Sequence, residues 1–473
     1  MKKIFSRTLW TILSAVLPAL VIAAIIGTNI CHKYEPFINA FFEVELYRVE
    51  NDGSDEDSTY FKSDYLGENG KYDDETMLGA AKQVSEIVAT EGIVMLKNNN
   101  DALPLAHGDN VSLLGISSVN WLYSGYGSGH VDNANAKNFM MAMNAAGFNV
   151  NSALNTFYTN CGYRRTAGQG QISLSPMNNS CNECPWNKYP SSVKSSFKKY
   201  STAIITLSRD GGEGAPWDPD LTNVINDGSP YSTTHNEIDA RFRNNNYLQL
   251  TKEEKEMIEQ VVALKQNGTF KKVVLLLNSS NTMQMDILST YADIDSILAV
   301  GMGGTMATSA VANILSGKYS PSGRLTDTYV YDNWSAPAME NFVPKDFVNI
   351  SDYPEITRLE SGAEDDDSYI VRQEGIYVGY RYYETRYEDC VLSQGNANGV
   401  KGVYAGKNNW NYSDEVCYPF GYGLSYTTFD YLKTEITEKN GDYIINVEVK
   451  KHGRRFRQGS RASVFAKAVY AIR

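Results

Sequence analysis

Short, almost wholly apolar runs are the feature that most restricts how this chain can fold. Runs of this kind, each of strand length, occupy residues 203–207, 273–277 and 297–300. Before the second run, residues 252–265 have helical periodicity, and Thr251 with Glu254 forms the pattern of a capping box at their start. Apolar strands that alternate with amphipathic helices favour a parallel sheet with helices on both faces. We therefore predict an α/β sandwich domain over residues 76–330.

A second apolar segment lies at the amino terminus. Residues 9–30 contain no charged side chain, and Lys2, Lys3 and Arg7 precede them. As a helix these residues span ~33 Å, enough to cross a hydrocarbon core of ~30 Å. We predict a transmembrane anchor, with residues 1–8 cytoplasmic and the bulk of the chain outside the cell membrane. A cleaved signal peptide is the alternative, although no A-x-A-like site ends the segment.

The charge of the chain excludes one large class of partners. The sequence has 43 Lys and Arg against 55 Asp and Glu, a net charge of −12, so it offers no broad basic surface to a nucleic acid. Residues 46–75 are polar and acidic, and we predict residues 31–75 to be a spacer after the anchor. The five histidines lack metal-ligand spacing, so we expect no metal, and no motif indicates an organic cofactor.

The six cysteines allow more than one interpretation. Cys181 and Cys184 have the spacing of half a zinc site, but a second half is missing. Outside the cell, disulfides could join Cys161 to Cys181 or Cys184, and Cys390 to Cys417. Free buried cysteines remain the alternative, because connectivity cannot be read from a sequence.

A carboxylate between glycines follows the first apolar run. Residues 208–214 are Ser-Arg-Asp-Gly-Gly-Glu-Gly, and α/β sheets bind ligands at the carboxyl ends of their strands. Glu213 is therefore a candidate catalytic group, and a plain turn with a solvated Glu is the alternative. We expect Arg209 and Asp210 to shape this loop, with substrate contact as their weaker role. Residues 125–129 are also glycine-rich but lack the Lys and Ser/Thr of a P-loop, so we predict a loop that lines a cleft.

Several motifs, in order along the chain, resemble segments of glycoside hydrolase family 3. They occupy residues 91–98, 320–325, 374–383 and 418–426. The first, Glu-Gly-Ile-Val-Met-Leu-Lys-Asn, resembles the opening of the family's second domain, and the second, Ser-Pro-Ser-Gly-Arg-Leu, resembles its end. The last two resemble the segment that leads into a fibronectin-III-like domain. One departure is Thr326-Asp327, where the family usually has Pro after the Arg-Leu pair.

The resemblance implies a β-glucosidase-like enzyme that hydrolyses terminal non-reducing β-D-glycosyl residues with retention. The family's general acid/base is a Glu in a Gly-Glu-Gly context, which maps onto Glu213, and its pKa must be raised for this role. The family's nucleophile is an Asp on a (β/α)₈ barrel of at least ~200 residues, for which this sequence has no room. We therefore expect the nucleophile to be absent and the chain to be inactive alone. A non-catalytic carbohydrate-binding or scaffold protein is the alternative.

The carboxyl-terminal part is predicted to lead into a second fold. Residues 331–428 are loop-rich and are expected to connect the sandwich domain to residues 429–473, the truncated start of a fibronectin-III-like β-sandwich. The expected arrangement is the front half of a domain-exchanged family member with its barrel downstream. Residues 451–473 contain seven Lys or Arg and no acidic residue. This composition fits either a basic tail or a frameshift near Lys450.

Overall fold

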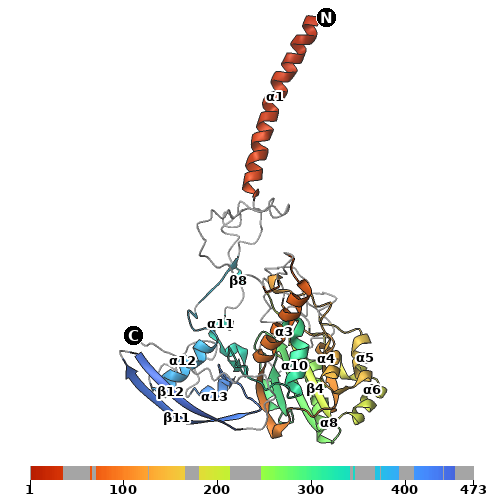
Figure 1. Cartoon of the computed structure of the whole chain (residues 1–473), viewed down its shortest axis with the longest axis vertical. Helices are drawn as coiled ribbons and strands as arrows, with labels where there is room; N and C mark the ends of the chain where they lie inside the picture. Colours follow the sequence, from red (N-terminus) through yellow and green to blue (C-terminus); the bar gives the residue numbers. More distant parts are fainter. Residues whose placement is uncertain are drawn as a thin grey trace. The chain divides into compact units, whose positions relative to one another are not determined.

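The computed structural model of the chain has two compact units, Met1–Asp74 and Glu75–Arg473. Figure 1 colours them along the sequence, and each is a body of its own. The structure describes residues 2–35, 64–65, 71–125, 127–165, 181–212, 247–340, 345–346, 368–372, 374–393, 410–439 and 442–452.

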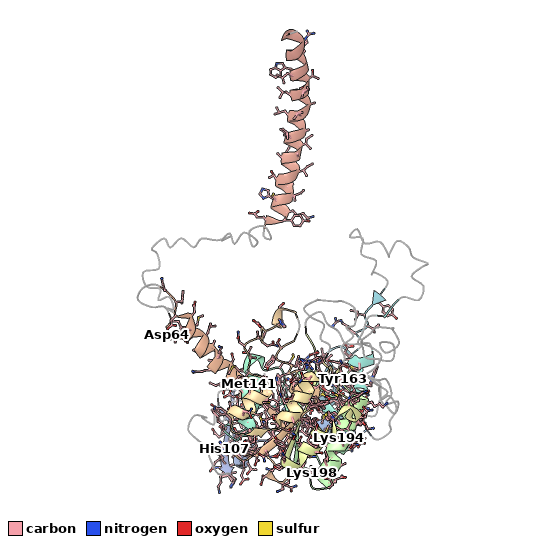
Figure 2. All side chains as sticks on the ribbon, turned by 90° about the vertical axis from the view of Figure 1, so that its right-hand side faces the viewer. Asp64, His107, Met141, Tyr163, Lys194 and Lys198 are labelled. Atoms are coloured by element: carbon pink, nitrogen blue, oxygen red, sulfur yellow. The ribbon has the colours of Figure 1, made fainter. Side chains whose placement is uncertain are left out.

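The first unit contains one long helix, α1 (Lys2–Lys33), within its described residues. Its segment Leu9–Lys33 has a mean hydropathy of 2.5 and is long and apolar enough to cross a membrane. Side chains leave this segment on all sides, and none of them is buried (Figure 2). A signal sequence has the same properties, so the apolar helix is confirmed while the membrane crossing stays a prediction. Most of the predicted spacer, residues 31–75, lies outside the described residues.

A six-stranded sheet organises the second unit. The strand order is β1-β6-β5-β4-β2-β3, and the five strands from β6 to β3 are parallel. All three predicted apolar runs are confirmed as strands, since they correspond to β4, β5 and β6 at the centre of the sheet. The strand bounds are Val94–Asn98 (β1), Asn110–Leu114 (β2), Asn149–Val150 (β3), Thr202–Arg209 (β4), Lys272–Ser279 (β5) and Ser296–Ala299 (β6).

One edge of the sheet corrects the prediction of a parallel sheet. Strand β1 pairs with β6 in antiparallel register, with Val94 opposite Ala299 and Asn98 opposite Ser296. The sheet is therefore mixed. An apolar run does not encode strand direction, and an antiparallel edge strand on a parallel sheet is a common arrangement.

The sheet separates two hydrophobic cores. Strand β5 shows the alternation: Val273, Leu275 and Leu277 belong to one core, and Val274 and Leu276 belong to the other. The first core is covered by α5 (Ser152–Asn160), α6 (Ser191–Ser196), α8 (Lys252–Gln266) and α9 (Asp286–Thr290). The second is covered by α4 (Phe139–Ala145) and α10 (Ala307–Leu315) (Figure 1). Helices on both faces confirm the predicted α/β layers.

Two of the motifs that are distant in sequence lie against each other. Leu325 N donates to the carbonyl of Tyr422, and Gly421 N donates to the carbonyl of Leu325. The amide of Leu424 donates to Met95 O on β1, so residues 418–426 also reach the edge of the sheet. Residues 320–325 and 418–426 thus lie together near the β1 edge of the sheet, although about a hundred residues separate them in the sequence.

The predicted connecting segment contains regular structure in its described parts. In this segment, strand β10 (Val416–Tyr418) pairs in antiparallel register with β7 (Tyr329–Val330), the last residues of the predicted sandwich domain. Helix α3 (Asp74–Gly92) precedes the sheet in the chain. The remaining short elements are α11 (Pro337–Glu340), β8 (Lys345–Asp346), β9 (Ser368–Tyr369), α12 (Tyr380–Val391) and α13 (Tyr412–Glu415).

The last described element is a long β-hairpin. Strand β11 (Thr428–Lys439) pairs with β12 (Asp442–His452) in antiparallel register, with Thr428 opposite His452. The predicted strands after residue 429 are confirmed. Their assignment to a fibronectin-III-like sandwich stays a prediction, because residues 453–473 lie outside the described part of the chain.

Candidate functional site

The order of the parallel strands reverses between β2 and β4. From β2 the chain passes to β3 on one side, and it then returns to β4 on the other side. In open α/β sheets, ligands bind outside the carboxyl ends of the strands at such a reversal. The glycine-rich residues 208–212 leave the carboxyl end of β4 at this point.

Two loops meet at the reversal so closely that glycine is required. Gly115, directly after β2, has φ +89°, and a Cβ there would collide with the carbonyl oxygen of Thr206. A Cβ on Gly125 would collide with the carbonyl oxygen of Gly211. The start of the predicted cleft-lining loop therefore lies directly on the stem that precedes Glu213.

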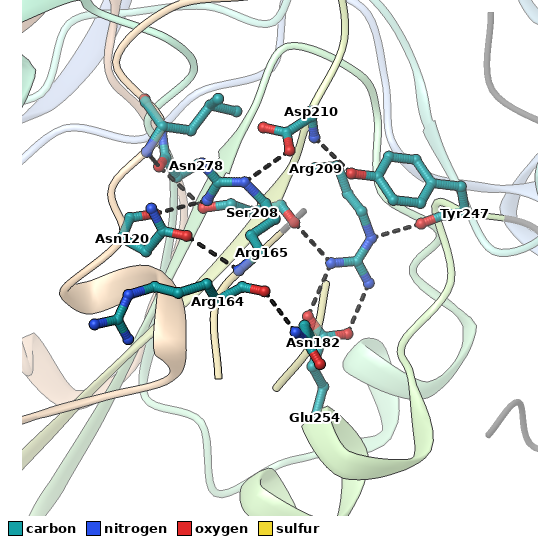
Figure 3. A network of polar contacts seen from close by, with 11 residues as sticks. Asn120, Arg164, Arg165, Asn182, Ser208, Arg209, Asp210, Tyr247, Glu254 and Asn278 are labelled. Atoms are coloured by element: carbon teal, nitrogen blue, oxygen red, sulfur yellow. Dashed lines mark hydrogen bonds and ion pairs between the residues drawn. The ribbon is translucent and has the colours of Figure 1, made fainter. Parts of the chain in front are cut away.

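Arg209, the last residue of β4, is held in a buried ion pair. Its guanidinium donates from Nη1 to Glu254 Oε1 at 2.8 Å and from Nη2 to Glu254 Oε2 at 2.7 Å (Figure 3). The side chain of Arg209 is 0% exposed and that of Glu254 is 3% exposed. Two parallel charge-assisted hydrogen bonds fix both the distance and the orientation of the two groups. The end of β4 is thereby joined to the first turn of α8.

The same guanidinium binds the backbone that returns to α8. Arg209 Nε donates to the carbonyl of Tyr247 at 2.5 Å, and Nη2 donates to the carbonyl of Gln249. In the opposite direction, the amide of Asp210 donates to the Tyr247 hydroxyl at 2.8 Å. Burial raises the pKa of Tyr247 well above its usual value, so its phenol stays neutral. Residues 213–246 lie outside the described part, but both of their stems end on this network.

Asp210 is held from the opposite side by Arg165. Arg165 Nε donates to Asp210 Oδ2 at 2.8 Å, and both side chains are buried. Arg165 Nη1 also donates to the carbonyl of Asn120 at 2.7 Å, while the Asn120 side chain accepts from the Arg165 amide (Figure 3). Asp210 Oδ1 is buried and has no hydrogen-bond partner among the described residues. The stem of the loop is thus fixed on two sides.

Asn278, on strand β5, connects that strand to the site. Its Oδ1 accepts from Ser208 Oγ at 3.0 Å and from the amide of Leu122 at 2.9 Å. Its Nδ2 donates to the carbonyls of Leu122 and Gly301. One buried amide near the end of β5 therefore connects strand β4 to the loops that follow β2 and β6.

A buried carboxyl lies behind the loop after β2. Glu183 is 2% exposed, and burial raises its pKa to about 8. Its Oε2 accepts from the amide of Ile116 at 2.7 Å, and the hydroxyl of Tyr158 accepts from the amide of Gly115 at 2.7 Å. These contacts hold the turn that carries Gly115 against β4.

The chain's relationships to known proteins agree with this architecture. The family model for the "Glycosyl hydrolase family 3 C-terminal domain" matches residues 93–426, well over half of the chain. The chain belongs to glycosyl hydrolase family 3. The resemblance inferred from the motifs is therefore confirmed.

Two of the curated relatives of this family 3 chain are bacterial β-glucosidases. It is 29% identical over 369 residues to Beta-glucosidase A of Butyrivibrio fibrisolvens, covering 77% of this chain and 37% of the relative. It is 26% identical over 385 residues to Thermostable beta-glucosidase B of Acetivibrio thermocellus, covering 81% of this chain and 37% of that protein. The chain thus spans less than half the length of these relatives.

Solved structures show the same fold. The structure of beta-glucosidase 3B from Thermotoga neapolitana in complex with glycerol matches with a TM-score of 0.55 and 23% identity. The match covers 82% of this chain and 43% of that one. A beta-glucosidase from Paenibacillus barengoltzii matches with a TM-score of 0.52 and 24% identity, over 78% of this chain and 32% of that chain. At these identities the likeness concerns the fold.

The structure describes some of the predicted site residues of this family 3 chain but not Glu213. Glu213 lies outside the described residues. Arg209 and Asp210 lie together at the loop stem, and both are buried among protein groups. Their roles in shaping the loop and in contacting substrate stay predictions. Arg165 and Tyr247 were not predicted, and no motif marks them. Within the described residues no group of three or more His, Cys, Asp or Glu is arranged to hold a metal.

Proposed function

We propose that this family 3 chain carries the acid/base part of a β-glucosidase-like active site, with Glu213 as general acid and base. The observation that carries the proposal is the doubly anchored stem. Arg209 and Asp210, four and three residues before Glu213, are bound to Glu254 and Arg165, respectively, at the strand-order reversal. A general acid must lie within hydrogen-bond reach of the departing oxygen, so its backbone needs such support.

The proposed reaction is hydrolysis of terminal non-reducing β-D-glycosyl residues with retention. In this chemistry one carboxyl group protonates the departing oxygen and later deprotonates water, while a second, roughly 5 Å away, attacks the anomeric carbon. Glu213 takes the first role. The nucleophile is assigned to no residue of this sequence, so we expect the chain by itself to lack turnover.

The proposed location is the outer face of a cell membrane. Residues 9–30 are proposed as a single-pass anchor, and the basic residues Lys2, Lys3 and Arg7 favour a cytoplasmic amino terminus. Extraction of membranes at alkaline pH tests this proposal, since an uncleaved anchor stays in the pellet. Recovery of a shortened chain in the soluble fraction would support a signal peptide instead.

Enzyme chimeras test the role of Glu213. Residues 93–426 of this chain replace the matched region of Beta-glucosidase A of Butyrivibrio fibrisolvens, and the chimera is assayed on aryl β-glucosides. We expect E213Q to lower kcat by about 10²–10⁴-fold on substrates with a poor leaving group. The loss should be smaller with an activated leaving group, which departs without protonation.

The matched control is Glu259→Gln, which changes a half-exposed carboxylate on α8. It should leave the rates of the chimera unchanged. Equal activity of E213Q and its parent on both substrates would contradict the proposal. In that case, sugar binding to the unaltered chain measured by calorimetry would support a carbohydrate-binding or scaffold protein.

A further inference from the structure

Two segments that flank residues 166–180 lie side by side. Cys161 is the C-cap residue that follows helix α5, and Asn182 Nδ2 donates to the carbonyl of Arg164 at 2.6 Å (Figure 3). This contact places Cys184 near Cys161, and the two thiols interact with each other. In addition, Cys161 Sγ donates to the carbonyl of Tyr158 at 3.3 Å, and Cys184 Sγ donates to the carbonyl of Pro185 at 3.9 Å. Cys161 is partly exposed and packs against the hydrophobic core that contains the buried Cys184.

Cys181 faces a different environment, although it is only three residues from Cys184. Its charged neighbours are Arg209, Glu254 and Asp210, which belong to the network around the loop stem. Asn182 has a positive φ of 49°, so the backbone turns between the two cysteines. Of the two partners that the sequence leaves open for Cys161, the geometry therefore favours Cys184.

The difference in exposure makes Cys161 the attacking group, because its thiol is partly exposed whereas that of Cys184 is buried. The interaction with Cys184 lowers the pKa of Cys161 to about 6, and the positive charge of Arg164 adds to this effect. The same pair raises the pKa of Cys184, and burial raises it further. A partly exposed thiolate beside a buried thiol is the arrangement of an attacking and a resolving cysteine.

We propose that Cys161 and Cys184 form a disulfide by exchange with a low-molecular-weight or protein disulfide. The Cys161 thiolate attacks one sulfur of the oxidant, whose S–S bond breaks and releases the first thiolate. Cys184 then attacks the Cys161 sulfur of the mixed disulfide, and the second oxidant thiolate leaves. The protons of the two cysteines pass to the released thiolates. The oxidant is reduced by two electrons, and the cysteine pair is oxidised by two.

The cross-link has a consequence for the candidate site. It closes the loop that runs from Cys161 to Cys184 and that contains Arg165 close to its first end. Arg165 is the residue that holds Asp210 on the stem of the Glu213 loop. Oxidation therefore fixes the base of the segment that supports this stem. The proposal concerns thiol chemistry and does not depend on glycosidase activity.

Peptide mapping tests the proposal on the full chain in detergent. The reduced protein is incubated with oxidised glutathione, remaining thiols are alkylated under denaturing conditions, and peptides are identified by mass spectrometry. We expect a peptide pair that joins Cys161 to Cys184, with Cys181 alkylated. Oxidation should also raise the thermal midpoint by roughly 5 °C, since the cross-link restricts the unfolded chain.

Single Ser variants give the controls. C181S should keep both the cross-link and the thermal shift, whereas C184S should leave Cys161 as a mixed disulfide with glutathione. C161S replaces the partly exposed thiol and should abolish the thermal shift. This variant keeps the proposal testable if C184S, which changes a buried residue, fails to fold. A Cys161–Cys181 peptide would overturn the proposal. So would a Cys161 that remains fully alkylated after oxidation.

Discussion

Strand β5 and the β11–β12 hairpin have similar strand-forming sequences but opposite surroundings. From Val273 to Ser279, every residue of β5 is buried. On the hairpin, Tyr431 is 75% exposed and Ile436 is 65% exposed. β-branched and aromatic residues favour strands in both places. The comparison teaches that such residues specify a strand, whereas the neighbouring elements decide whether the strand contributes a core.

The candidate site is built on the buried strands of the sheet. Arg209 ends the buried strand β4, and Asn278 lies near the end of β5. Groups on strands that are packed on both faces have little freedom to move, which is a requirement for precise positioning. Changes in the sheet should therefore cost far more stability than changes in the hairpin, and the following variants test that contrast.

The largest effect is expected at the buried ion pair. Glu254→Gln leaves the Arg209 guanidinium charged, buried and without its counter-ion, and we expect a loss of about 3–5 kcal/mol in the free energy of unfolding. Urea denaturation followed by circular dichroism measures it. Glu259→Gln, on the half-exposed side of the same helix, should change the value by less than about 0.5 kcal/mol. Equal effects of the two variants would mean that the pair is structurally unimportant.

A core truncation should have the next largest effect. Leu275→Ala removes a fully buried side chain from the first core, and we expect a loss of about 3 kcal/mol from lost burial and the remaining cavity. The same urea titration measures this change. A loss under about 1 kcal/mol would indicate that the sheet is as loosely packed as the hairpin.

The buried carboxyl Glu183 should make stability depend on pH. Its pKa is about 8 in the folded chain against 4.5 as the ordinary value, so the folded state binds the proton more tightly. Its contribution is fully present below pH 4.5 and is lost as pH rises through about 8. Between pH 6 and 7 the slope reaches up to about −1.4 kcal/mol per pH unit.

Glu183→Gln should flatten this slope, because the amide does not titrate. Unfolding free energies of both proteins at a series of pH values between 5 and 8 give the comparison. Parallel pH profiles would show that Glu183 titrates alike in both states, contrary to its burial.

The smallest effect is expected on the hairpin. Ile436→Thr changes an exposed side chain to another β-branched residue, so strand propensity is kept and little burial is lost. The change in unfolding free energy should stay within about 0.5 kcal/mol. A loss comparable to that of Leu275→Ala would show that another part of the molecule covers this strand in solution.

The site could be predicted only in part. The residues 208–214 were recognisable because glycines flank a carboxylate directly after an apolar run. Glu254 was identified as half of a capping box, and the structure confirms that box with Thr251. Its second role as the counter-ion of Arg209 had no local signal, since the two residues are 45 positions apart. Arg165 is also 45 positions from Asp210, and nothing in its neighbourhood marks it as an anchor.

By itself, the sequence determined the apolar amino-terminal helix, the buried strands and the capped helix α8, because these follow from patterns among near neighbours. The family motifs could be recognised for the same reason, because each is a short contiguous segment. The tertiary structure alone decided the antiparallel direction of β1 and the ion pairs of Arg209 and Asp210. It also decided that Cys161 lies next to Cys184. These features depend on how distant segments pack, and packing is a property of the whole unit that no short pattern encodes.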